Sequence, residues 1–475
     1  MNWRRQTSKS GAARRNKQME SKDRSQQIAE EALRLHALYC GKTQIAPKCP
    51  IHDARDFSYW YTPGVAAPCR AIACDTEKVW EYTNKSNLIA IVSDGSRVLG
   101  LGNIGPLAGL PVMEGKALLF KYLGGVDAVA ICLGTQNQQE FIRTVQFLEP
   151  SFGAINLEDI AQPRCFRILD ELRRTMAIPV WHDDQQGSAT ALLAGLIGAL
   201  KVAGKRIDSI RIAMIGMGAA NFATYRLLKA YGVSPAQIVA CDSRGVLHRN
   251  RQDLEEHRED CREKWSVCVE TNPEAVTGGI EQALRGADVC IAFACSEPGV
   301  IQPAWIRAMA RDAIVFACAN PEPEIWPEDA KAAGALVVAT GRGDFPNQLN
   351  NSLVFPGIMR GTLDARASTI TDEMAIAAAL ELACCAEERG CREDAILPKM
   401  DDWRIVPRVA AATALKAQEQ GLARVIRSRE EWIHLATERV RESHRISEAL
   451  VRAETQELAA NVGETAHTSF QGKRS

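Results

Sequence analysis

Carboxylate side chains gather at two points where an apolar run of the sequence ends. Glu158 and Asp159 follow the run GAIN, and Asp183 and Asp184 follow the run IPVWH. Such runs are typical of buried strands, and ligands of open α/β sheets bind beyond the carboxyl ends of the strands. Several carboxylates at one sheet edge make an oxygen site that suits Mg²⁺ or Mn²⁺. The alternative is that each acidic pair caps the helix that follows it.

Two further side chains could transfer protons. Lys116 stands among apolar residues in PVMEGKALLF, and Tyr61 stands in YWYTPGVA, a segment that a proline and a glycine interrupt. A single lysine is more often solvated, and a single tyrosine is more often part of a core, so neither residue identifies a site by itself. Asn320 and Asn350, with its neighbour Asn351, lie at strand ends or in loops. An amide there can hold a substrate carboxylate or cap a turn.

Two glycine-rich loops could bind a dinucleotide, and the first has the better match to the pattern. The segment GLGNIG at 100–105 fits the spacing G-x-G-x-x-G in every letter. However, Pro106 and Pro111 follow at once, where the pattern needs a helix whose N-terminus faces the pyrophosphate. We therefore expect this first loop not to bind the cofactor.

The second glycine loop has the right surroundings. The apolar run SIRIAMI precedes it and the helical run AANFATYRLLKAYG follows, so it joins a strand to a helix. The residues expected to contact the pyrophosphate are Gly216, Gly218, Ala219 and Ala220. Asn221 replaces the third glycine of the pattern, which normally lets the helix pack closely on the strand, so we expect the helix to lie slightly further out.

An acidic residue after the next strand bears on the choice between NAD and NADP. The run QIVACD ends in Asp242, where a carboxylate can bond the adenine ribose hydroxyls. This carboxylate would repel the 2′-phosphate of NADP, so the sequence favours NAD. Arg244 lies close enough along the chain to accommodate such a phosphate, so NADP stays possible.

Composition excludes several classes of protein. The chain has 475 residues, is 46% hydrophobic and 24% charged, and carries a net charge of −1, as expected for a globular protein of two to four domains. Without an excess of basic charge we expect no nucleic-acid partner. The longest uncharged apolar stretch, 189–200, is too short to span a membrane. The 15 cysteines include no Cys-x-x-Cys pair, which indicates thiols in a reducing cytoplasm.

Four stretches follow from the pattern of apolar runs. Residues 1–25 are predicted to be a disordered basic arm, and residues 26–160 to form an N-terminal α/β domain. Residues 161–425 alternate strand runs with helical runs, which predicts a doubly wound parallel sheet of the Rossmann type. Residues 426–475 are predicted to add a helical extension and a polar tail. In that extension Trp432, Leu435, Val440 and Ile446 are spaced as on one helix face.

Taken together, the motifs resemble those of the malic enzyme family, in its smaller, bacterial-type class. They occur in the family's order from Tyr61 to Arg424: YTPGVA, YTNK, VLGLGNIGPLAG, PVMEGKA, INLEDI, HDDQ, FPNQLNN and FPGIMRGTLD. The resemblance implies oxidative decarboxylation of L-malate to pyruvate and CO₂, with NAD or NADP and Mg²⁺ or Mn²⁺. It also implies a homodimer or homotetramer whose N-terminal domain binds the substrate.

The resemblance also implies a role for each candidate residue. Lys116 would be the general base, Tyr61 the acid that protonates the enol, and Asp183 the neighbour that tunes the lysine. The implied metal ligands are Glu158, Asp159 and Asp184. The residues implied to bind malate are Arg97, Asn320 and Asn350, and Asn320 is also implied to contact the cofactor. A lysine base needs a pKa lowered from about 10.4 to about 7–8, which burial and a metal cation can supply.

Two departures from the bacterial pattern leave the chemistry intact. Where bacterial relatives typically read HDDQHGTA, this chain has Gln186 and Ser188. Two other functions share the same residues: a malolactic-type or oxaloacetate-decarboxylating enzyme, and a catalytically silent nucleotide-binding regulatory protein. The second is disfavoured because a silent relative need not keep Tyr61, Lys116 and all three acidic ligands.

Overall fold

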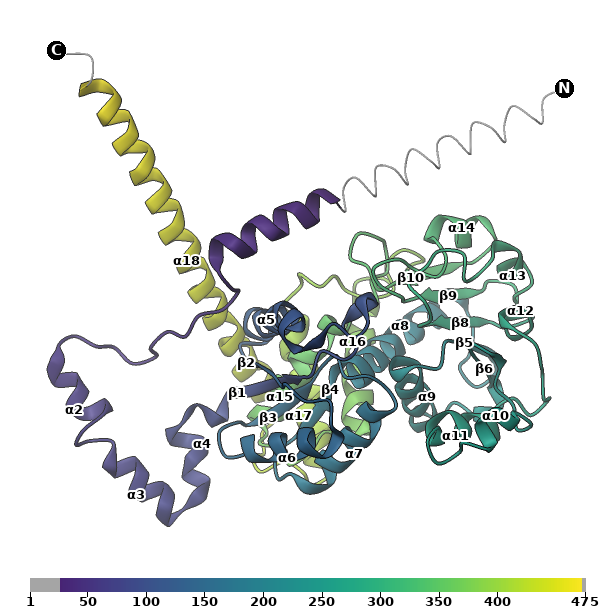
Figure 1. Cartoon of the computed structure of the whole chain (residues 1–475), viewed down its shortest axis with the longest axis horizontal. Coiled ribbons are helices and arrows are strands. Elements are labelled where there is room, and N and C mark those ends of the chain that lie inside the picture. The colour runs from purple at the N-terminus through teal and green to yellow at the C-terminus, as the bar shows by residue number, and fades with distance from the viewer. Residues whose placement is uncertain (1–25, 472–475) are drawn as a thin grey trace. The chain divides into compact units, whose positions relative to one another are not determined.

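The computed structural model describes residues 26–471, and their side chains as far as residue 452. The expected basic arm at 1–25 lies outside the described residues. The chain divides into two compact units, Met1–Asp56 and Phe57–Ser475. In the first unit the described residues form a helix over 26–39 and a short 3₁₀ helix, Ala54–Asp56. Both sheets and the candidate site belong to the second unit (Figure 1).

The first sheet has four parallel strands in the order β2-β1-β3-β4. The strands are β1 (Leu88–Ser93), β2 (Asp127–Cys132), β3 (Ala154–Leu157) and β4 (Val180–His182). Alternate residues of β1 face opposite sides of the sheet. Ile89 and Ile91 pack under α5 (Gly105–Gly124). Ala90 and Val92 pack on the other side, against α6 (Gln138–Leu148) and α7 (Arg164–Thr175). Helices therefore cover both faces of this sheet.

The second sheet has six strands in the order β10-β9-β8-β5-β6-β7. Five are parallel: β5 (Ile212–Ile215), β6 (Ile238–Asp242), β8 (Val289–Ala292), β9 (Ile314–Ala317) and β10 (Val337–Thr340). Every parallel strand begins with buried apolar residues, because helices cover both faces of the sheet. One face is covered by α8 (Ser188–Ala203) and α9 (Ala219–Tyr231). The other is covered by α12 (Ile280–Leu284), α13 (Pro303–Arg307) and α14 (Pro327–Ala332). The predicted α/β, Rossmann-type architecture is confirmed.

Two strands differ from expectation. The run that ends in His182 was expected to open the second region, but β4 is hydrogen-bonded to β3, so the first sheet extends past residue 160. The two-residue β7 (Gly245–Val246) pairs antiparallel with β6 and is too short to leave an apolar pattern.

Helices complete the second unit. Short ones precede β1 or follow β7: α2 (Phe57–Trp60), α3 (Ala66–Cys74), α4 (Val79–Tyr82), α10 (Gln252–Glu255) and α11 (Arg262–Glu270). Longer ones follow the last strand: α15 (Phe355–Asp364), α16 (Asp372–Glu388), α17 (Ile405–Glu419) and α18 (Arg429–Gln471). The stretch Asp183–Ala203 is the one described helical stretch that is long and apolar enough to cross a membrane, but 72% of it is buried inside the protein, as in the core helix of a globular domain.

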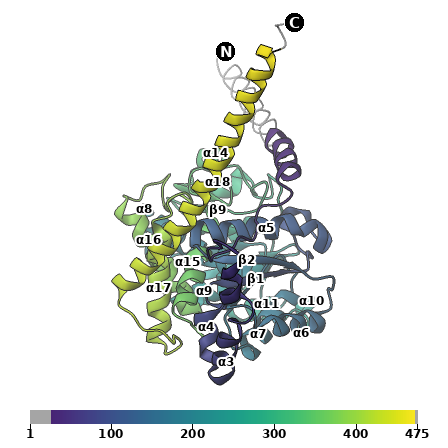
Figure 2. The same cartoon turned by 90° about the vertical axis from the view of Figure 1, so that its left-hand side faces the viewer.

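The predicted C-terminal helix is α18, which packs on α17 and α5 (Figure 2). Trp432 and Val440 are buried, whereas Ile446 is exposed. Ser443 Oγ donates a hydrogen bond to Lys121 O of α5, and the ring of His444 stacks on Tyr122. The first turns of α18 are therefore part of the core of this unit.

Candidate active site

Lys116 of α5 lies at the centre of a buried cluster of charges. Its Nζ atom is 2.6 Å from Oδ2 of Asp183 and 2.9 Å from Oε1 of Glu158, and all three side chains are almost fully buried. The ammonium group also lies 4.5 Å from the ring centroid of Phe355, on α15. The structure therefore brings the lysine together with one residue from each acidic pair.

The register of the first sheet places the two acidic pairs side by side. β3 and β4 are adjacent and parallel, with Leu157 opposite His182, so the residues after both strands reach the same sheet edge. Asp183 begins a π-helical turn, Asp183–Gly187, that leads into α8. A Cβ atom at Gly187 would lie 2.0 Å from Oδ1 of Asp183, so only glycine leaves room for this carboxylate.

Hydrogen bonds hold three of the carboxylates in different ways. Trp181 Nε1 donates to Oδ1 of Asp183 at 3.0 Å, and Asn156 Nδ2 donates to Oε2 of Glu158 at 2.8 Å. The backbone N–H of Asp159 donates to Oδ2 of Asp184 at 2.8 Å. The contacts of Asp183 and Glu158 thus orient them toward Lys116.

Burial and mutual repulsion make the acidic residues reluctant to ionise. Burial, reinforced by the charge of Asp184, raises the pKa of Asp159 to about 8. Burial likewise raises the pKa of Glu158 and that of Asp184, although the nearby lysine opposes the shift in both. Carboxylates in this state gain most from a neighbouring cation, because it favours their charged forms.

The three predicted metal ligands offer the right atoms without forming a ready coordination shell. Among the described residues, no three His, Cys, Asp or Glu side chains converge closely enough to hold an ion as they stand. The reason lies in Glu158, which is turned toward Lys116 and Asn156. Oδ2 of Asp159, however, is buried without a hydrogen-bond partner. Three carboxylates with one unpartnered oxygen fit a hard cation of the Mg²⁺ or Mn²⁺ type.

Without a bound cation, the pKa of Lys116 is raised. Burial alone would lower it, but the charges of Asp183 and Glu158 outweigh burial and raise the pKa above its usual value. The predicted lowering depends on a bound metal cation, and for the metal-loaded protein it stays a prediction. The lysine is protonated at neutral pH while both carboxylates face it.

The structure places the predicted substrate residues in different ways. The backbone N–H of Arg97 donates to Asp159 O at 3.0 Å, so its exposed side chain begins beside a predicted metal ligand. Asn350 Oδ1 accepts from Ser352 N at 2.9 Å and caps a 3₁₀ turn. Asn351 lies against the other acidic turn, with its Cβ 3.1 Å from a Cβ built on Gly187.

Asn320 lies where the loops of the two sheets meet. A Cβ built on Gly100, in the loop after β1, would lie 2.9 Å from the carbonyl oxygen of Asn320, in the loop after β9. The Asn320 side chain itself is close to Gly341, whose built Cβ would be 2.5 Å from Nδ2. The first glycine loop thus lines the junction between the substrate and nucleotide halves.

Tyr61 is the predicted residue that the chain does not bring to the cluster. Its side chain is 70% exposed, in the turn that links α2 to α3. Figure 1 shows α2 and α3 apart from α5, the helix that carries Lys116. Within one chain, therefore, the predicted acid and the predicted base are separated.

The second glycine loop has the geometry of a dinucleotide site. It connects β5 to α9, and Gly216 has φ +83°, with a built Cβ only 2.5 Å from Phe293 O. Gly218 precedes the first residue of α9, and a built Cβ there would have only Gln162 Nε2 nearby, at 3.9 Å, so a phosphate could approach the helix N-terminus closely. Ala219 and Ala220 form the first turn of that helix.

Asn221 has a structural task in this loop. Its buried Nδ2 donates to Ile215 O at 3.0 Å and to Gly216 O at 2.7 Å. The side chain thus ties the helix to the end of β5.

The first glycine loop differs from expectation: α5 does begin at Gly105, with Pro106 in its first turn, where proline is tolerated. That loop nevertheless follows β1 and so belongs to the first sheet, whereas the second glycine loop follows β5 of the second sheet.

Asp242 ends β6, and basic residues surround it. Its Oδ1 is 3.1 Å from Arg251, and its Oδ2 is 3.6 Å from Nζ of Lys264. Arg244, the residue considered for NADP, lies 3.1 Å from Asp253 instead. The carboxylate predicted to bind a ribose is therefore already paired with cations.

A parallel-sheet domain with a phosphate-binding loop, joined to a buried lysine–carboxylate cluster, defines a class of dinucleotide-dependent enzymes. Comparison with known proteins identifies the member of this class. Residues 40–173 match "Malic enzyme, N-terminal domain" and residues 185–418 match "Malic enzyme, NAD binding domain". The chain belongs to the malic enzyme family, as the motifs of the sequence indicated.

Curated relatives agree on the family and differ in their cofactor. The "Bifunctional malic/malolactic enzyme" of Bacillus subtilis is 47% identical over 84% of this chain and 95% of its own length. The "NAD-dependent malic enzyme" of Geobacillus stearothermophilus is 46% identical, over 81% of this chain and 78% of its own length. The "NADP-dependent malic enzyme" of Halomonas elongata is 42% identical, over 81% of this chain and 92% of its own length.

Solved structures share the whole fold. The malic enzyme of Entamoeba histolytica superposes with a TM-score of 0.88 at 45% identity, over 90% of each chain. That of Pyrococcus horikoshii superposes with a TM-score of 0.83 at 48% identity, over 89% of this chain and 98% of its own. The chain is therefore an enzyme of this family that uses a nicotinamide cofactor.

Proposed function

We propose that this protein catalyses the oxidative decarboxylation of L-malate to pyruvate and CO₂, with NAD as the preferred cofactor and Mg²⁺ or Mn²⁺ as the metal. The observation that carries the proposal is the contact of Lys116 with Asp183 and Glu158 at a buried sheet edge. The family assignment supplies the reaction type. We also propose a cytoplasmic location.

Each residue of the cluster has a task in this reaction. When bound, the nicotinamide supplies a hydride acceptor and the divalent cation supplies positive charge that favours an enolate. With Glu158 turned to the metal, Lys116 loses one of the two carboxylates that keep it protonated, and as a neutral amine it takes the proton from the C2 hydroxyl of malate. Asp183 holds the ammonium group that forms. The metal would be held by Glu158, Asp159 and Asp184.

The proposal also assigns the residues that hold the substrate and return a proton. Arg97, Asn320 and Asn350 would bind the carboxylates of malate and fix C2 beside Lys116. Tyr61 would protonate C3 of the enol to give pyruvate. Because hydrogen-bond reach is needed for each transfer, Tyr61 must come within about 3 Å of its target atom.

We propose that a second copy of the chain supplies Tyr61, in a homo-oligomer that is at least a dimer. Tyr61 is remote from the cluster of its own chain, and helices α2 and α3 contain no buried residue. Around it Phe57, Tyr59 and Trp60 are each more than half exposed. Large exposed aromatic side chains close together in the chain are typical of a protein–protein contact.

The cofactor preference follows from the charges at the end of β6. Asp242 lies where the adenine ribose would bind, and an acidic side chain there favours the hydroxyls of NAD over a phosphate. Its pairing with Arg251 and Lys264 weakens that repulsion. We therefore propose that NADP is accepted as a poorer cofactor.

A malolactic reaction is the second candidate, because the Bacillus subtilis relative is named a bifunctional malic/malolactic enzyme. Incubation of the full chain with L-malate, Mn²⁺ and NAD, followed by analysis of products, separates the two. Our proposal predicts pyruvate together with NADH. Lactate without accumulation of NADH would support the malolactic reaction instead.

A further inference from the structure

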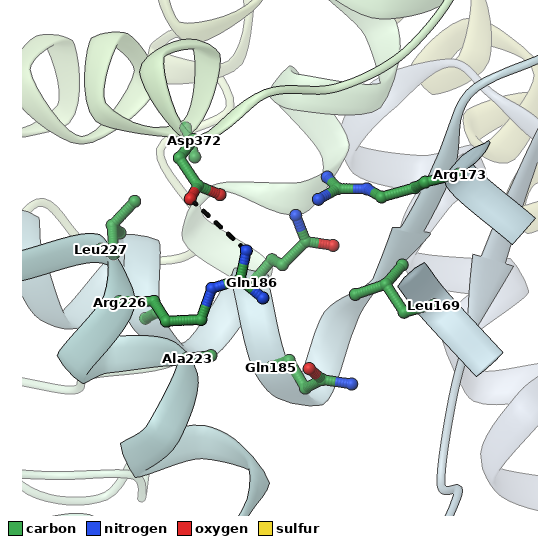
Figure 3. A pocket seen from close by; sticks show the side chains of 10 residues that line it. Leu169, Arg173, Gln185, Gln186, Ala223, Arg226, Leu227 and Asp372 are labelled. Carbon is green, nitrogen blue, oxygen red and sulfur yellow. Dashed lines mark ion pairs between the residues drawn. The ribbon is translucent and has the colours of Figure 1, made fainter. Parts of the chain in front are cut away.

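A small cavity lies behind the active site, between elements that belong to both sheets. It is lined by α7, the Asp183–Gly187 turn, α8, α9 and α16, and its volume is about 20 Å³ (Figure 3). A volume of this size holds about one water molecule or one monatomic ion. Its polar lining consists of Arg173, Arg226, Gln185, Gln186 and Asp372.

Two amide groups in the lining are buried donors without a partner. Gln185 is 3% and Gln186 is 8% exposed, and Nε2 of each makes no hydrogen bond. The orientation of the second amide is fixed, because its Oε1 accepts from His182 N at 3.0 Å. Figure 3 shows its nitrogen directed toward the space between Arg173 and Asp372. Buried donors of this kind require an acceptor, which a water molecule or an anion can provide.

The charges of the lining favour an anion over water. Arg173 donates to the carbonyl oxygens of Val180 and Ile370, and no carboxylate among the described residues forms an ion pair with it. Burial lowers its pKa to about 10, so the guanidinium stays charged at neutral pH. Arg226 lies 3.9 Å from Asp372 and 4.0 Å from Asp170, too far for direct hydrogen bonds.

The groups just outside the cavity are paired among themselves. Asp170 is shared with Arg262, at 3.4 Å, and Arg262 lies closer still to Glu263, at 2.9 Å. The excess of positive charge is therefore confined to the cavity lining. Within the cavity itself, Arg173 and Arg226 face Asp372 alone.

We propose that this cavity binds one halide-sized monoanion, held by Arg173, Arg226 and the amide of Gln186. The anion would join α7, beside the first sheet, to α9, beside the second. It would also stabilise the turn that carries Asp183 and Asp184. An effect on malate turnover rests on the proposed function, whereas binding of the anion does not.

Crystals of the full chain soaked in bromide give the direct test. We expect an anomalous difference peak between Arg173, Arg226 and Gln186. A fully occupied water without anomalous signal at this position would overturn the proposal. A peak in a protein that does not turn over malate would uphold the anion site and reject the proposed function, so the two failures are distinguishable.

Thermal unfolding tests binding in solution. At constant ionic strength, replacing gluconate by chloride should raise the Tm of the wild type along a saturating curve. Arg226→Gln and Gln186→Glu remove a positive charge or add a negative one, and each should weaken apparent chloride affinity about tenfold or more. Arg285→Gln, directly after α12, removes an exposed arginine elsewhere and should respond like the wild type. Identical chloride curves for all four proteins would overturn the proposal.

Discussion

Asp183 connects the lysine of the site to the core of the first sheet. Its Oδ2 lies 2.6 Å from Nζ of Lys116, while its Oδ1 accepts a hydrogen bond from Trp181. Both oxygens of the carboxylate are therefore held, and the contact with Asp183 fixes the position of the lysine amine. In the proposed reaction, Asp183 therefore positions the lysine that takes the proton and transfers none itself.

Removing the amine of Lys116 should abolish turnover. General acid–base groups contribute roughly 10²–10⁴-fold, so Lys116→Ala should lower kcat by at least about a hundredfold. Binding of the nucleotide, at the separate loop after β5, should stay intact. The measurement is NADH formation from L-malate, with nucleotide fluorescence as the binding control. Wild-type turnover in this variant would remove Lys116 from the reaction.

A divalent cation should stabilise the protein through its acidic residues. Addition of Mn²⁺ should raise Tm, because a ligand present at about 100 times its Kd adds about 2.7 kcal/mol to the free energy of unfolding. Asp159→Asn removes one repelling carboxylate, so its metal-free Tm should equal or exceed that of the wild type, while the rise with Mn²⁺ should shrink. Asp208→Asn, on an exposed loop, is the matched control. An undiminished rise in the Asp159 variant would exclude this residue as a ligand.

Changing the acid at the end of β6 should alter the choice of cofactor. Asp242→Ser removes one carboxylate from Arg251 and Lys264. Arg251 stays paired with Asp253 at 2.7 Å, but the site becomes more positive and attracts the 2′-phosphate of NADP. The ratio of kcat/KM for NADP to that for NAD should rise by about tenfold or more, equivalent to about 1.4 kcal/mol. Steady-state kinetics with both cofactors measure it. A ratio that stays at the wild-type value would show that the adenine ribose does not approach this residue.

Mixed dimers test whether Tyr61 acts on the partner's site. Tyr61→Phe and Lys116→Ala should each be inactive alone. After the two are unfolded and refolded together, half of the dimers are hybrids, and each hybrid has one site with an intact lysine and an intact tyrosine. Activity should therefore return to about a quarter of the wild-type value. Mixtures as inactive as the separate variants would instead place Tyr61 in its own chain's site.

The buried start of α18 should contribute strongly to stability. Trp432 is 2% exposed, and its Nε1 donates to Gln418 of α17 at 2.5 Å. Trp432→Ala should reduce the free energy of unfolding by about 3–5 kcal/mol, as for other buried tryptophans. Ile446→Ala, 45% exposed on the same helix, should change it far less. Urea unfolding measures both, and equal effects would contradict the packing of this helix.

Apolar runs predicted most of the sheets, because a strand buried on both faces leaves an unbroken hydrophobic pattern. The strand before Asp183 was recognised but assigned to the wrong sheet, since pairing depends on neighbours that no local pattern reveals. Pro106 and Pro111 suggested that no helix follows the first glycine loop. α5 nevertheless starts at Gly105, because proline is tolerated in the first turn, where Pro106 lies. Packing of the helix outweighs the unfavourable effect of Pro111 in its interior.

The sequence predicts which residues form the candidate site better than it predicts their contacts and pKa values. The acidic pairs reach one edge because they follow adjacent parallel strands, as strand-end reasoning requires. Phe355 and Asn156, which contact Lys116 and Glu158, went unrecognised although both stand inside quoted motifs, FPGI and INLED. The raised pKa of Lys116 in the absence of a cation depends on distances to Asp183 and Glu158, which spacing along the chain does not give.

The most direct test of the proposed function is a stoichiometric assay of the full chain with L-malate, NAD and Mn²⁺. Reduced nicotinamide and pyruvate should form in equal amounts, and a chelator should stop both. Lys116→Ala, assayed beside the wild type, should form neither product. Nicotinamide reduction without pyruvate, or no reaction with either NAD or NADP, would contradict the assignment of malate decarboxylation to this lysine–carboxylate site.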